Sequence, residues 1–391
     1  MKILSINAGS SSLKFGLFNM ETNTCISSGL FERIGLESSS YTIKLGEEKV
    51  VQEAVMETHV DAVKLLLDKL ISLEIIKGFH EINGVGHRVV HGKDKYSSSV
   101  VINDLVIADL EEFSEYAPLH NSANVMGIKA FREVLPEVLM VAVFDTAFHQ
   151  SVDKVNYLYP VPLEWNTKYG VRKYGFHGTS HRYIAQRVKS IFGESFKQIN
   201  CHLGQGGSIC AIKDGVSVDT TMGFTPLSGI MMGTRSGDVD PSIITYIMEK
   251  EGMNASEVID SLNKKSGLLG MSELSNDMRD VLEACDNGNE KAIIARDKFV
   301  RRVVDYIASY YVMLGGVDVI TFTAGIGENS IPVRRMICEE LACLGIKIDL
   351  DKNNIRGEEV CISTDDSSVK VMIIPTDEEL MIAMDTEKFI K

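Results

Sequence analysis

Two polar segments of the chain carry residue types suited to the transfer of a phosphoryl group. The first is Phe-His-Gly-Thr-Ser-His at residues 176–181, and the second is Met-Gly-Thr-Arg-Ser-Gly-Asp at residues 232–238. Histidine, arginine, hydroxyl groups and glycine-rich backbone are the donors that stabilise a phosphoryl group in transfer. An apolar core does not require them, so both segments are candidates for a site.

Within the first segment the two histidines have different predicted roles. His177 and His181 are four residues apart, which is the spacing of a metal-binding pair on a helix. The intervening Gly-Thr-Ser predicts instead that Thr179 or Ser180 caps a helix beginning near His181. His177 then lies outside the helix and is the functional candidate, whereas His181 is more typical of a core histidine with its hydrogen bonds satisfied.

Two arginines are candidate anion ligands. Arg88 lies in the strand-like run of residues 86–92 among apolar neighbours, where an unpaired guanidinium is costly to bury. It requires an anion, either an internal carboxylate or a bound carboxylate or phosphate. Arg235 lies between Gly233 and Gly237 on a polar loop, which favours a site over a plain surface position.

Three glycine-rich turns are candidate phosphate-binding loops. They cover residues 7–12, 204–208 and 323–330, and each follows an apolar, strand-like run. Glycine lets backbone N–H groups approach phosphate oxygens because it tolerates positive φ and has no Cβ. One such turn is usually structural, but three in one chain favour a nucleotide site. The classical loops do not match, because the glycine spacing in residues 86–94 is too long for a P-loop and Ser330 interrupts the dinucleotide fingerprint.

Strand and helix patterns alternate along the chain and predict an α/β fold. Residues 3–18 and 199–212 share the pattern of strand, polar turn and strand, which indicates an internal duplication. Residues 138–144 and 317–322 predict buried strands, residues 60–70 and 300–314 predict amphipathic helices, and a short helix begins after Pro375. A chain of 391 residues exceeds one hydrophobic core, so two domains are expected, with a boundary just after Asp145-Thr146.

The composition excludes several classes of protein. Hydrophobic residues make up 45% of the chain without a run approaching the roughly 20 residues of a membrane span, and the N-terminus lacks signal-peptide features. We therefore expect a cytoplasmic protein without a membrane partner. A net charge of −14 argues against a nucleic-acid partner. The seven cysteines are scattered without zinc-binding spacing and are expected to be reduced thiols.

Taken together, these motifs resemble the acetokinase family over nearly the whole chain. The matching runs are INAGSSSLKF, HRVVHG, FDTAFH, YGFHGTSH, GFTPLSGIMMGTRSGD, SNDMRD, FTAGIGENS and PTDEEL, in that order. The resemblance implies two duplicated actin-like ATPase domains of the ribonuclease H-like type, with a nucleotide cleft between them. Residues 1–146, joined by a C-terminal helix at about 379–391, would form the N-terminal domain, and residues 147–378 the nucleotide-binding domain.

The resemblance also implies a role for individual residues. Asp145, His177 and Arg235 would be the catalytic trio, and Asn7 and Glu378 would serve the metal. Arg88 would hold the acyl carboxylate, with Val90, Leu119, Phe176 and Pro226 around its methyl group. Contacts to the nucleotide would come from Lys14, His202, Leu203, Gly204, Gln205, Gly206, Asp277, Met278, Arg279, Gly325, Ile326, Gly327, Glu328 and Asn329.

The activity implied by the resemblance is reversible transfer of the ATP γ-phosphoryl group to acetate, giving acetyl phosphate and ADP. It implies Mg²⁺, or alternatively Mn²⁺, and a homodimer. A propionate or other short-acyl kinase is the alternative, and a non-enzymatic actin-like switch or a dehydrogenase fits less well. The acid, with a pKa of roughly 4.3, is already ionised at pH 7. We therefore predict that Asp145 orients Arg88 or a magnesium-bound water. Gln205 replaces the usual Asn of the family pattern, which leaves the phosphoryl donor open.

Overall fold

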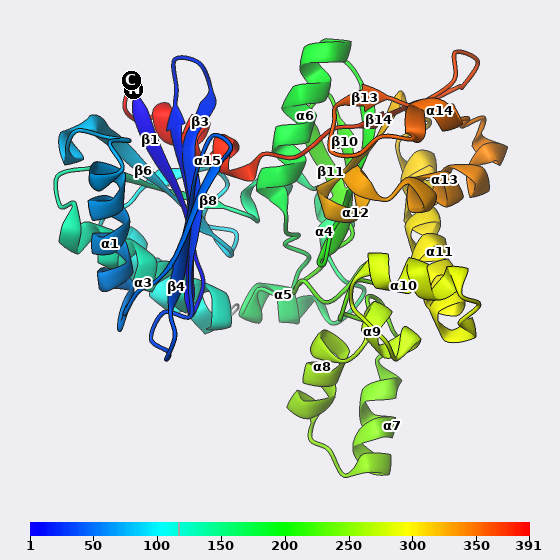
Figure 1. Cartoon of the computed structure of the whole chain (residues 1–391). Coiled ribbons are helices and arrows are strands. Elements are labelled where there is room, and N and C mark those ends of the chain that lie inside the picture. The colour runs from blue at the N-terminus through cyan, green and yellow to red at the C-terminus, as the bar shows by residue number, and fades with distance from the viewer. Residues whose placement is uncertain (116–117) are drawn as a thin grey trace. The chain divides into compact units, whose positions relative to one another are not determined.

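The computed structural model describes the backbone of residues 1–115 and 118–391 and the side chains of residues 1–115 and 121–391 (Figure 1). The chain divides into two compact units. Unit 1 comprises Met1–Phe148 and Asp377–Lys391, and unit 2 comprises His149–Thr376. The predicted boundaries at residues 146 and 378 each lie two residues from a boundary between these units.

Unit 1 is built on an eight-stranded mixed sheet. Its strand order is β5-β4-β3-β2-β1-β6-β8-β7. β1 pairs antiparallel with β2 and parallel with β6, and β6 pairs parallel with β8. The strands are β1 (Lys2–Ala8), β2 (Ser12–Asn19), β3 (Thr24–Glu32), β4 (Ser40–Leu45), β5 (Glu48–Glu53), β6 (Ile82–Val89), β7 (Val100–Val101) and β8 (Leu139–Phe144).

Helices cover both faces of this sheet. Leu4 and Ile6 of β1 belong to the core formed with α1 (His59–Ser72) and α3 (Pro118–Val134), whereas Ile3 packs with Ala383 of α15 (Glu378–Glu387). Successive side chains of a strand point to opposite faces, so α15 lies on the face opposite α1 and α3. The chain thus ends back on unit 1, as Figure 1 shows for the red α15 beside the blue strands. The remaining α-helix of the described part of unit 1 is α2 (Asp104–Glu112).

A glycine of β6 permits the close approach of α15. A Cβ on Gly86 would lie 2.3 Å from Thr386 Oγ1 and 2.6 Å from Ile382 Cγ2. Real Cβ atoms do not come this close to other heavy atoms, so the helix could not pack at this depth over a larger residue. The contact holds the start of α15 near the ends of β6 and β8, where Arg88 and Asp145 lie.

Unit 2 repeats the central strand arrangement of unit 1. Its six-stranded sheet has the order β11-β10-β9-β12-β14-β13, in which β9 pairs antiparallel with β10 and parallel with β12. The five strands β11-β10-β9-β12-β14 therefore correspond to β3-β2-β1-β6-β8 of unit 1. This confirms the predicted duplication and is the order of the ribonuclease H-like, actin-type ATPase fold. The strands are β9 (Lys197–Leu203), β10 (Gly207–Lys213), β11 (Val216–Thr220), β12 (Val319–Thr323), β13 (Val360–Cys361) and β14 (Lys370–Ile373).

The two faces of β9 differ in polarity. Ile199, Cys201 and Leu203 belong to the large apolar core with α11 (Glu290–Met313), whereas the alternate residues are polar and face α6 (Gly178–Phe192). The other helices of unit 2 are α4 (Lys154–Tyr157), α5 (Leu163–Tyr169), α7 (Ser242–Glu251), α8 (Ala255–Lys264), α9 (Gly267–Ser272), α10 (Met278–Asp286), α12 (Ala324–Asn329), α13 (Ile331–Glu340) and α14 (Leu350–Asn353).

Three general expectations can be compared with this structure. All seven cysteines are free, as predicted, and four of them are buried. Within the described parts of the chain, no helix combines the length and apolarity needed to cross a bilayer. The predicted strands at residues 138–144 and 317–322 correspond to β8 and β12, and the predicted helices at 60–70 and 300–314 to α1 and α11.

Candidate active site

A buried ion pair stands at the ends of two parallel strands of unit 1. Arg88 is the penultimate residue of β6, and Asp145 directly follows β8, its neighbour in the sheet. The Arg88 Nε donates to Asp145 Oδ1 at 3.2 Å and Nη2 donates to Asp145 Oδ2, which makes the pair bidentate. Asp145 is 1% exposed. Two parallel N–H···O bonds fix the plane of the guanidinium as well as its position.

This pair leaves part of the arginine available. Within the described part of the chain, Arg88 Nη1 has no hydrogen-bond partner, and the side chain is 21% exposed. Burial opposes the charge of Arg88, but Asp145 and Glu378 outweigh it and raise the pKa of the guanidinium. The arginine is therefore charged, oriented and able to donate to a further anion.

Glu378 brings a second carboxylate to the same place. It is the first residue of α15, and burial together with the charge of Asp145 raises its pKa to about 7, while Arg88 acts in the opposite direction. When Glu378 is ionised, two carboxylates outnumber the one guanidinium and leave a net negative charge in a buried position. Such a position favours a bound cation.

The two predicted metal ligands, Asn7 and Glu378, both belong to unit 1. Asn7 lies at the end of β1, opposite Lys14 in the register of β1 and β2, and is half-buried. The described residues contain no group of three or more His, Cys, Asp and Glu side chains arranged to hold a metal. Mg²⁺ does not need one, because it keeps several waters and binds through one or two carboxylates plus substrate phosphates. Glu378 and Asn7 carry the oxygen donors that a magnesium site of that kind uses.

Lys14 has a partner within its own unit. Its ammonium forms an ion pair with Glu379, the neighbour of Glu378, and its side chain is 54% exposed. An approach of Lys14 to a phosphate would exchange one anion for another, which costs little at an exposed site.

The apolar residues predicted in unit 1 have different outcomes. Val90 is buried, and its N–H donates to Asn124 Oδ1 at 3.1 Å. Asn124 Nδ2 in turn donates to Ala8 O at 3.0 Å, which ties the residue after β6 to the end of β1. Leu119 belongs to α3, but its side chain lies outside the described residues.

In unit 2 the structure corrects the predicted start of the helix after His177. α6 begins at Gly178, and His177 is its N-cap residue with φ 57° and ψ 22°. Thr179 and Ser180 lie in the first turn and do not cap the helix. Ser180 is unavailable as a cap because its hydroxyl contacts His202 Nδ1 and Thr376 Oγ1, both at 2.8 Å. His177 does lie outside the helix, as predicted.

His177 and Arg235 converge on a glycine of the turn between β9 and β10. A Cβ on Gly206 would lie 3.3 Å from Arg235 Nη1 and 3.6 Å from His177 Nε2. The His177 ring stacks on His202 with centroids 4.2 Å apart. His177 and Arg235, which are 58 positions apart in the sequence, thus both approach the backbone of Gly206. His202, a predicted nucleotide-binding residue, lies beside His177.

Arg235 is a cation without a carboxylate partner among the described residues. Its Nη1 donates to Pro226 O at 3.3 Å and contacts Met232 Sδ at 3.7 Å. Burial lowers the pKa of Arg235. A partly buried guanidinium with only neutral acceptors favours the binding of an anion. Pro226 is half-buried, and Phe176, before His177, is buried.

The third predicted glycine turn is a short helix, α12. Its first N–H, that of Ala324, donates to Glu328 Oε1 at 2.7 Å, and Thr376 N donates to the same oxygen at 3.1 Å. At the other end, Arg334 Nη1 donates to the carbonyls of Gly327 and Glu328 at 3.0 and 2.8 Å. The prediction of a turn was wrong, because the Glu328 side chain accepts from the first N–H of the helix and the Arg334 side chain donates to its last carbonyls, so the end groups of the helix have partners. Asn329 also bonds internally, with Nδ2 donating to Gly325 O at 2.9 Å.

The segment Asp277, Met278 and Arg279 forms the start of α10. Asp277 caps the helix by accepting from Arg279 N at 2.8 Å and also pairs with the Arg279 guanidinium, which is largely exposed. Met278 is buried in the apolar core of unit 2. The exposed guanidinium, the partly exposed Asp277 carboxylate and the backbone of this segment are therefore accessible to a ligand.

Sequence reasoning did not find Arg334. This side chain of α13 is fully buried, and its Nη2 also donates to Asn353 O and Ile355 O, while Nε donates to Asn353 Oδ1. All its acceptors are neutral, and burial lowers its pKa to about 10. A signal was present, because Arg334 precedes the apolar Ile337 and Cys338 by three and four residues and so shares their helix face.

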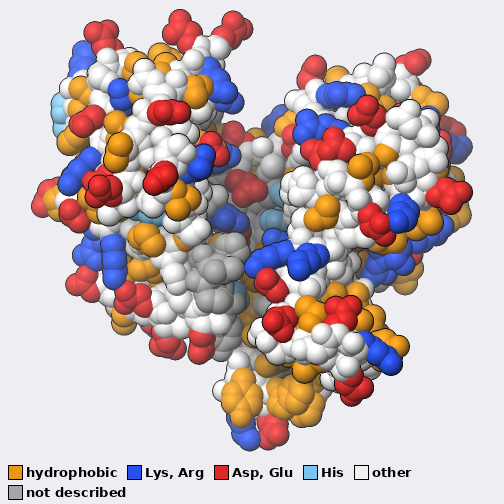
Figure 2. All heavy atoms as spheres, turned by 60° about the horizontal axis from the view of Figure 1, so that its bottom comes forward, with side chains coloured by type: hydrophobic (Ala, Val, Ile, Leu, Met, Phe, Trp, Pro, Cys, Tyr) orange, Lys and Arg blue, Asp and Glu red, His pale blue; other side chains and the backbone are white. Residues whose placement is uncertain are grey.

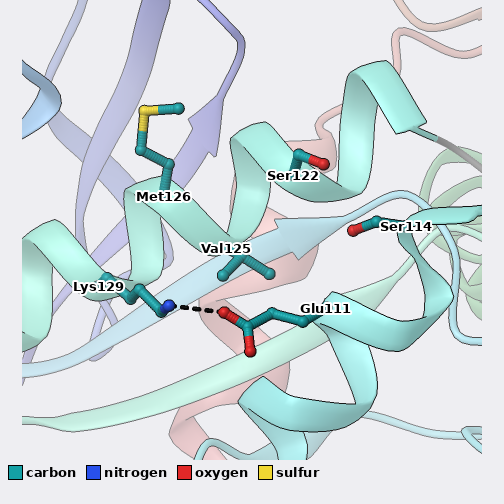
Figure 3. Close-up of a pocket in the computed structure, with 6 residues that line it drawn as sticks. All are labelled: Glu111, Ser114, Ser122, Val125, Met126 and Lys129. Atoms are coloured by element: carbon teal, nitrogen blue, oxygen red, sulfur yellow. Dashed lines mark hydrogen bonds and ion pairs between the residues drawn. The ribbon is translucent and has the colours of Figure 1, made fainter.

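A surface pocket lies elsewhere in unit 1, between α2 and α3 (Figure 3). It has a volume of about 480 Å³ and contains none of the candidate residues, and Lys129 Nζ lies 2.6 Å from Glu111 Oε1 beside it. Because its charged groups satisfy each other, we assign it no function. Its lining residues are Glu111, Ser114, Ser122, Val125, Met126 and Lys129.

The duplicated fold and these clusters define an α/β phosphotransferase of the actin-like ATPase type. The chain belongs to the acetokinase family, whose sequence profile matches residues 2–384. It is 54% identical to the acetate kinase of Bacillus subtilis (strain 168), with 100% of both chains covered. Its structure is similar to that of Porphyromonas gingivalis acetate kinase, with a TM-score of 0.96, 44% identity and full coverage of both chains. It is also similar to a propionate kinase from Francisella tularensis, with a TM-score of 0.94, 41% identity and 99% coverage of both chains.

Arg334 generates a prediction about the predicted nucleotide segment. Arg334→Lys replaces a five-bond guanidinium with a point charge that cannot reach all its acceptors, so carbonyls of α12 and residues 353–355 lose their partners. We expect the free energy of unfolding to fall by about 3 kcal/mol and the KM for the nucleotide to rise. Urea unfolding and steady-state kinetics measure the two effects.

Arg335→Lys is the matched control, since Arg335 makes an exposed ion pair with Glu339, and should change stability by less than about 0.5 kcal/mol. Equal effects of the two variants would contradict the assignment.

Proposed function

We propose that this protein catalyses the reversible, magnesium-dependent transfer of the ATP γ-phosphoryl group to acetate, giving acetyl phosphate and ADP. The observation that carries the proposal is the 54% identity, over its full length, to a protein named acetate kinase. The contacts within each unit support chemical roles for several of the candidate residues. ATP as a substrate also favours action in the cytoplasm.

In this proposal Arg88 binds the carboxylate of the acid through Nη1. Asp145 holds the other edge of the guanidinium and so acts as a positioning residue. One carboxylate oxygen attacks the γ-phosphorus while the bond from that phosphorus to the bridging oxygen of ADP breaks. No base is required, because a carboxylic acid with a pKa of roughly 4.3 has already lost its proton at pH 7. The contact between Arg88 and Asp145 supports this positioning role.

Unit 2 supplies the stabilisation of the phosphoryl group. A loose transition state spreads negative charge over three equatorial oxygens, and fixed donors lower its energy. His177 and Arg235 are the donors in this proposal, since both approach Gly206 and Arg235 has only neutral acceptors. The absence of a side chain at Gly206 leaves room for a phosphoryl oxygen between them.

Glu378 and Asn7 would hold Mg²⁺, or Mn²⁺, largely through water. When bound, the metal neutralises charge on the phosphate oxygens of the nucleotide. The nucleotide itself would be held by the turn at residues 202–206, by Asp277 and Arg279, and by the backbone of α12. Lys14 would exchange Glu379 for a phosphate oxygen.

A propionate kinase is the second candidate, favoured by the similarity to the Francisella tularensis enzyme. In our proposal Val90, Leu119, Phe176 and Pro226 surround the methyl group of the acid. A β-branched Val90 leaves less room than alanine would, which favours two carbons over three. One methylene contributes only about 1 to 3 kcal/mol of discrimination, so some activity with propionate follows. A non-enzymatic ATP switch has no need for Arg88 as a carboxylate ligand.

The proposed reaction is tested by trapping the acyl phosphate with hydroxylamine. Acetate, propionate and butyrate are each combined with ATP, GTP or pyrophosphate in the presence of Mg²⁺. We expect the highest kcat/KM with acetate and ATP, and a value about tenfold lower with propionate. A higher value with propionate would replace the proposal with its alternative. No acyl phosphate with any of the acids would end the kinase assignment.

Asp145 generates a second prediction. Asp145→Asn keeps the shape but loses the charge, and only one of its two polar atoms accepts a hydrogen bond from Arg88. We expect kcat/KM for acetate to fall about 100-fold through misplacement of Arg88, with the affinity for Mg²⁺ unchanged. Asp109→Asn is the control, because Asp109 is a buried carboxylate of the same unit that pairs with Lys95 and Tyr96. Full activity in Asp145→Asn would contradict the positioning role.

We further propose that the protein is a homodimer whose contact includes α7. No residue of α7 is buried, and its Ile243 and Tyr246 are 41% and 59% exposed. In the neighbouring α8, Ile259 is 37% exposed. Figure 2 shows hydrophobic side chains gathered on the part of the surface that carries α7 and α8. An apolar patch of this kind in a water-exposed helix pair favours a contact with a second copy of the chain.

Light scattering after size-exclusion chromatography tests the dimer. We expect the wild-type protein to elute with the mass of two chains and the double variant Ile243→Asp, Tyr246→Asp with the mass of one. Val312→Asp is the control, since Val312 is equally apolar and 78% exposed on α11. A monomeric wild type contradicts the dimer, and a dimeric double variant contradicts the contact through α7.

A further inference from the structure

Unit 2 contains a column of buried polar side chains between its sheet and α6. Gln198, Asn200 and His202 alternate along β9, and Thr321 of β12 lies opposite Asn200 in the parallel register. All four are 6% exposed or less. Burying amides, hydroxyls and imidazoles costs free energy unless the groups are hydrogen-bonded. The hydrogen bonds that these side chains make therefore fix their positions.

These side chains form one continuous chain of hydrogen bonds that ends at His177. Gln198 Nε2 donates to Thr321 Oγ1 at 2.9 Å, and Thr321 Oγ1 donates to Asn200 Oδ1 at 2.7 Å. Asn200 Nδ2 lies 2.8 Å from His181 Nδ1. The Ser208 hydroxyl then lies 2.7 Å from His181 Nε2 and 2.9 Å from His177 Nδ1.

The chain has a direction because its amide nitrogens can only donate. Asn200 Nδ2 carries hydrogens, so His181 Nδ1 must accept, and the ring proton of a neutral His181 is on Nε2. That N–H donates to Ser208, whose single hydroxyl proton is then given to His177 Nδ1. An imidazole that accepts at Nδ1 carries its proton at Nε2.

His181 is neutral in this arrangement. It is fully buried, and burial together with the neighbouring His149 and His202 lowers its pKa well below the usual value for histidine. The ring therefore has one proton and transmits the direction set by Asn200. A charged His181 would donate from both nitrogens and would oppose the Asn200 amide.

We propose that Asn200, His181 and Ser208 are positioning residues that fix His177 as the Nε2–H tautomer. The inference rests on the proposed function, because it assigns the direction of a hydrogen bond in that reaction. Nε2 is the nitrogen of His177 on the side of Gly206 and Arg235. The Nε2–H tautomer presents a donor to a phosphoryl oxygen, whereas the other tautomer would present a lone pair and repel it.

The same chain explains the two histidines of the segment at residues 176–181. The hydrogen-bonded chain holds the His177 tautomer through neutral groups, so the chain itself adds no negative charge beside an anionic substrate. His181 is a core histidine with satisfied hydrogen bonds, as its burial indicates. It also passes the hydrogen-bond direction set by Asn200 on to Ser208.

The test reads the tautomer directly. The full-length protein is labelled with ¹⁵N-histidine, and a two-bond ¹H–¹⁵N correlation spectrum distinguishes protonation at Nδ1 from protonation at Nε2. The signal of His177 is assigned by its absence in His177→Gln. We expect His177 and His181 both to be Nε2–H tautomers in the wild-type protein. A His177 protonated at Nδ1 would overturn the proposal, whatever the activity.

Asn200→Asp should reverse the chain, because a carboxylate can only accept. His181 would then be protonated at Nδ1, Ser208 would donate to His181, and His177 would donate from Nδ1 to Ser208. We expect kcat to fall about 100-fold, while the KM values for acetate and ATP change by less than about threefold. Thr321→Ser keeps the hydroxyl and is the matched control, with the wild-type spectrum and kcat.

A second variant removes the dependence on a buried carboxylate. Ser208→Ala breaks the bridge between the two rings without adding charge, and we expect a mixture of His177 tautomers with a lowered kcat. A reversed or mixed His177 with unchanged kcat would overturn the role in the reaction. Absence of acetyl phosphate formation in the wild type, with the expected spectrum, would instead contradict the proposed function alone.

Discussion

The pairing of Arg88 with Asp145 is the interaction around which unit 1 is organised. It forms because β6 and β8 are parallel neighbours, so that the ends of both strands reach the same edge of the sheet. It is buried, so each charge depends on the other and on the placement of both strands. Glu378 adds a second carboxylate from the last helix, and the glycine at position 86 lets that helix approach. Two central strands of unit 1 and the last helix of the chain thus contribute to one charged group.

Unit 2 has the same strand order as unit 1, but its two buried or partly buried arginines are held differently from Arg88. Arg235 and Arg334 are both partly or fully buried, and both have neutral acceptors only among the described residues. Arg334 satisfies all its nitrogens with carbonyls and an amide oxygen, so it is structural. Arg235 makes two long contacts and retains capacity for an anion. The number of satisfied donors, more than burial, separates a structural arginine from a candidate ligand.

Much of this arrangement follows from the sequence, because its causes are local. The duplicated strand, turn and strand pattern predicts β1 with β2 and β9 with β10, and the apolar periodicity predicts α1 and α11. The helix start at Gly178 and the helix at residues 324–329 were not predicted. For Ser180 the reason lies in the tertiary fold, because its hydroxyl contacts Thr376 and His202, which are distant in sequence. For the helix at residues 324–329, the side chains that satisfy its end groups, Glu328 and Arg334, are close in sequence, but the glycine-rich composition masked the helix. Partners such as those of Ser180 are set by the tertiary fold and leave no local signal.

The polar face of β9 could have been predicted from the alternation of polar and apolar residues along the strand. Gln198, Asn200 and His202 alternate with Ile199, Cys201 and Leu203, a pattern that normally indicates one solvent-exposed face of a strand. Here the strand is central in the sheet, between β10 and β12, and α6 covers the polar face. The polar residues of such a strand pair with polar groups of the elements packed beside it, here Thr321 of β12 and Ser180 and His181 of α6.

Gln205 shows how one substitution in this loop depends on a neighbouring glycine. Its carbonyl accepts from Gly233 N at 3.0 Å, and a Cβ on Gly233 would lie 2.3 Å from Gln205 Oε1. The Gln205 side chain therefore lies directly against residue 233, where the lack of a side chain leaves it room. Gly233 also belongs to the loop that carries Arg235, in which Met232 N donates to Arg235 O at 3.0 Å. The backbone hydrogen bond between Gln205 and Gly233 thus ties the turn after β9 to the loop that carries Arg235.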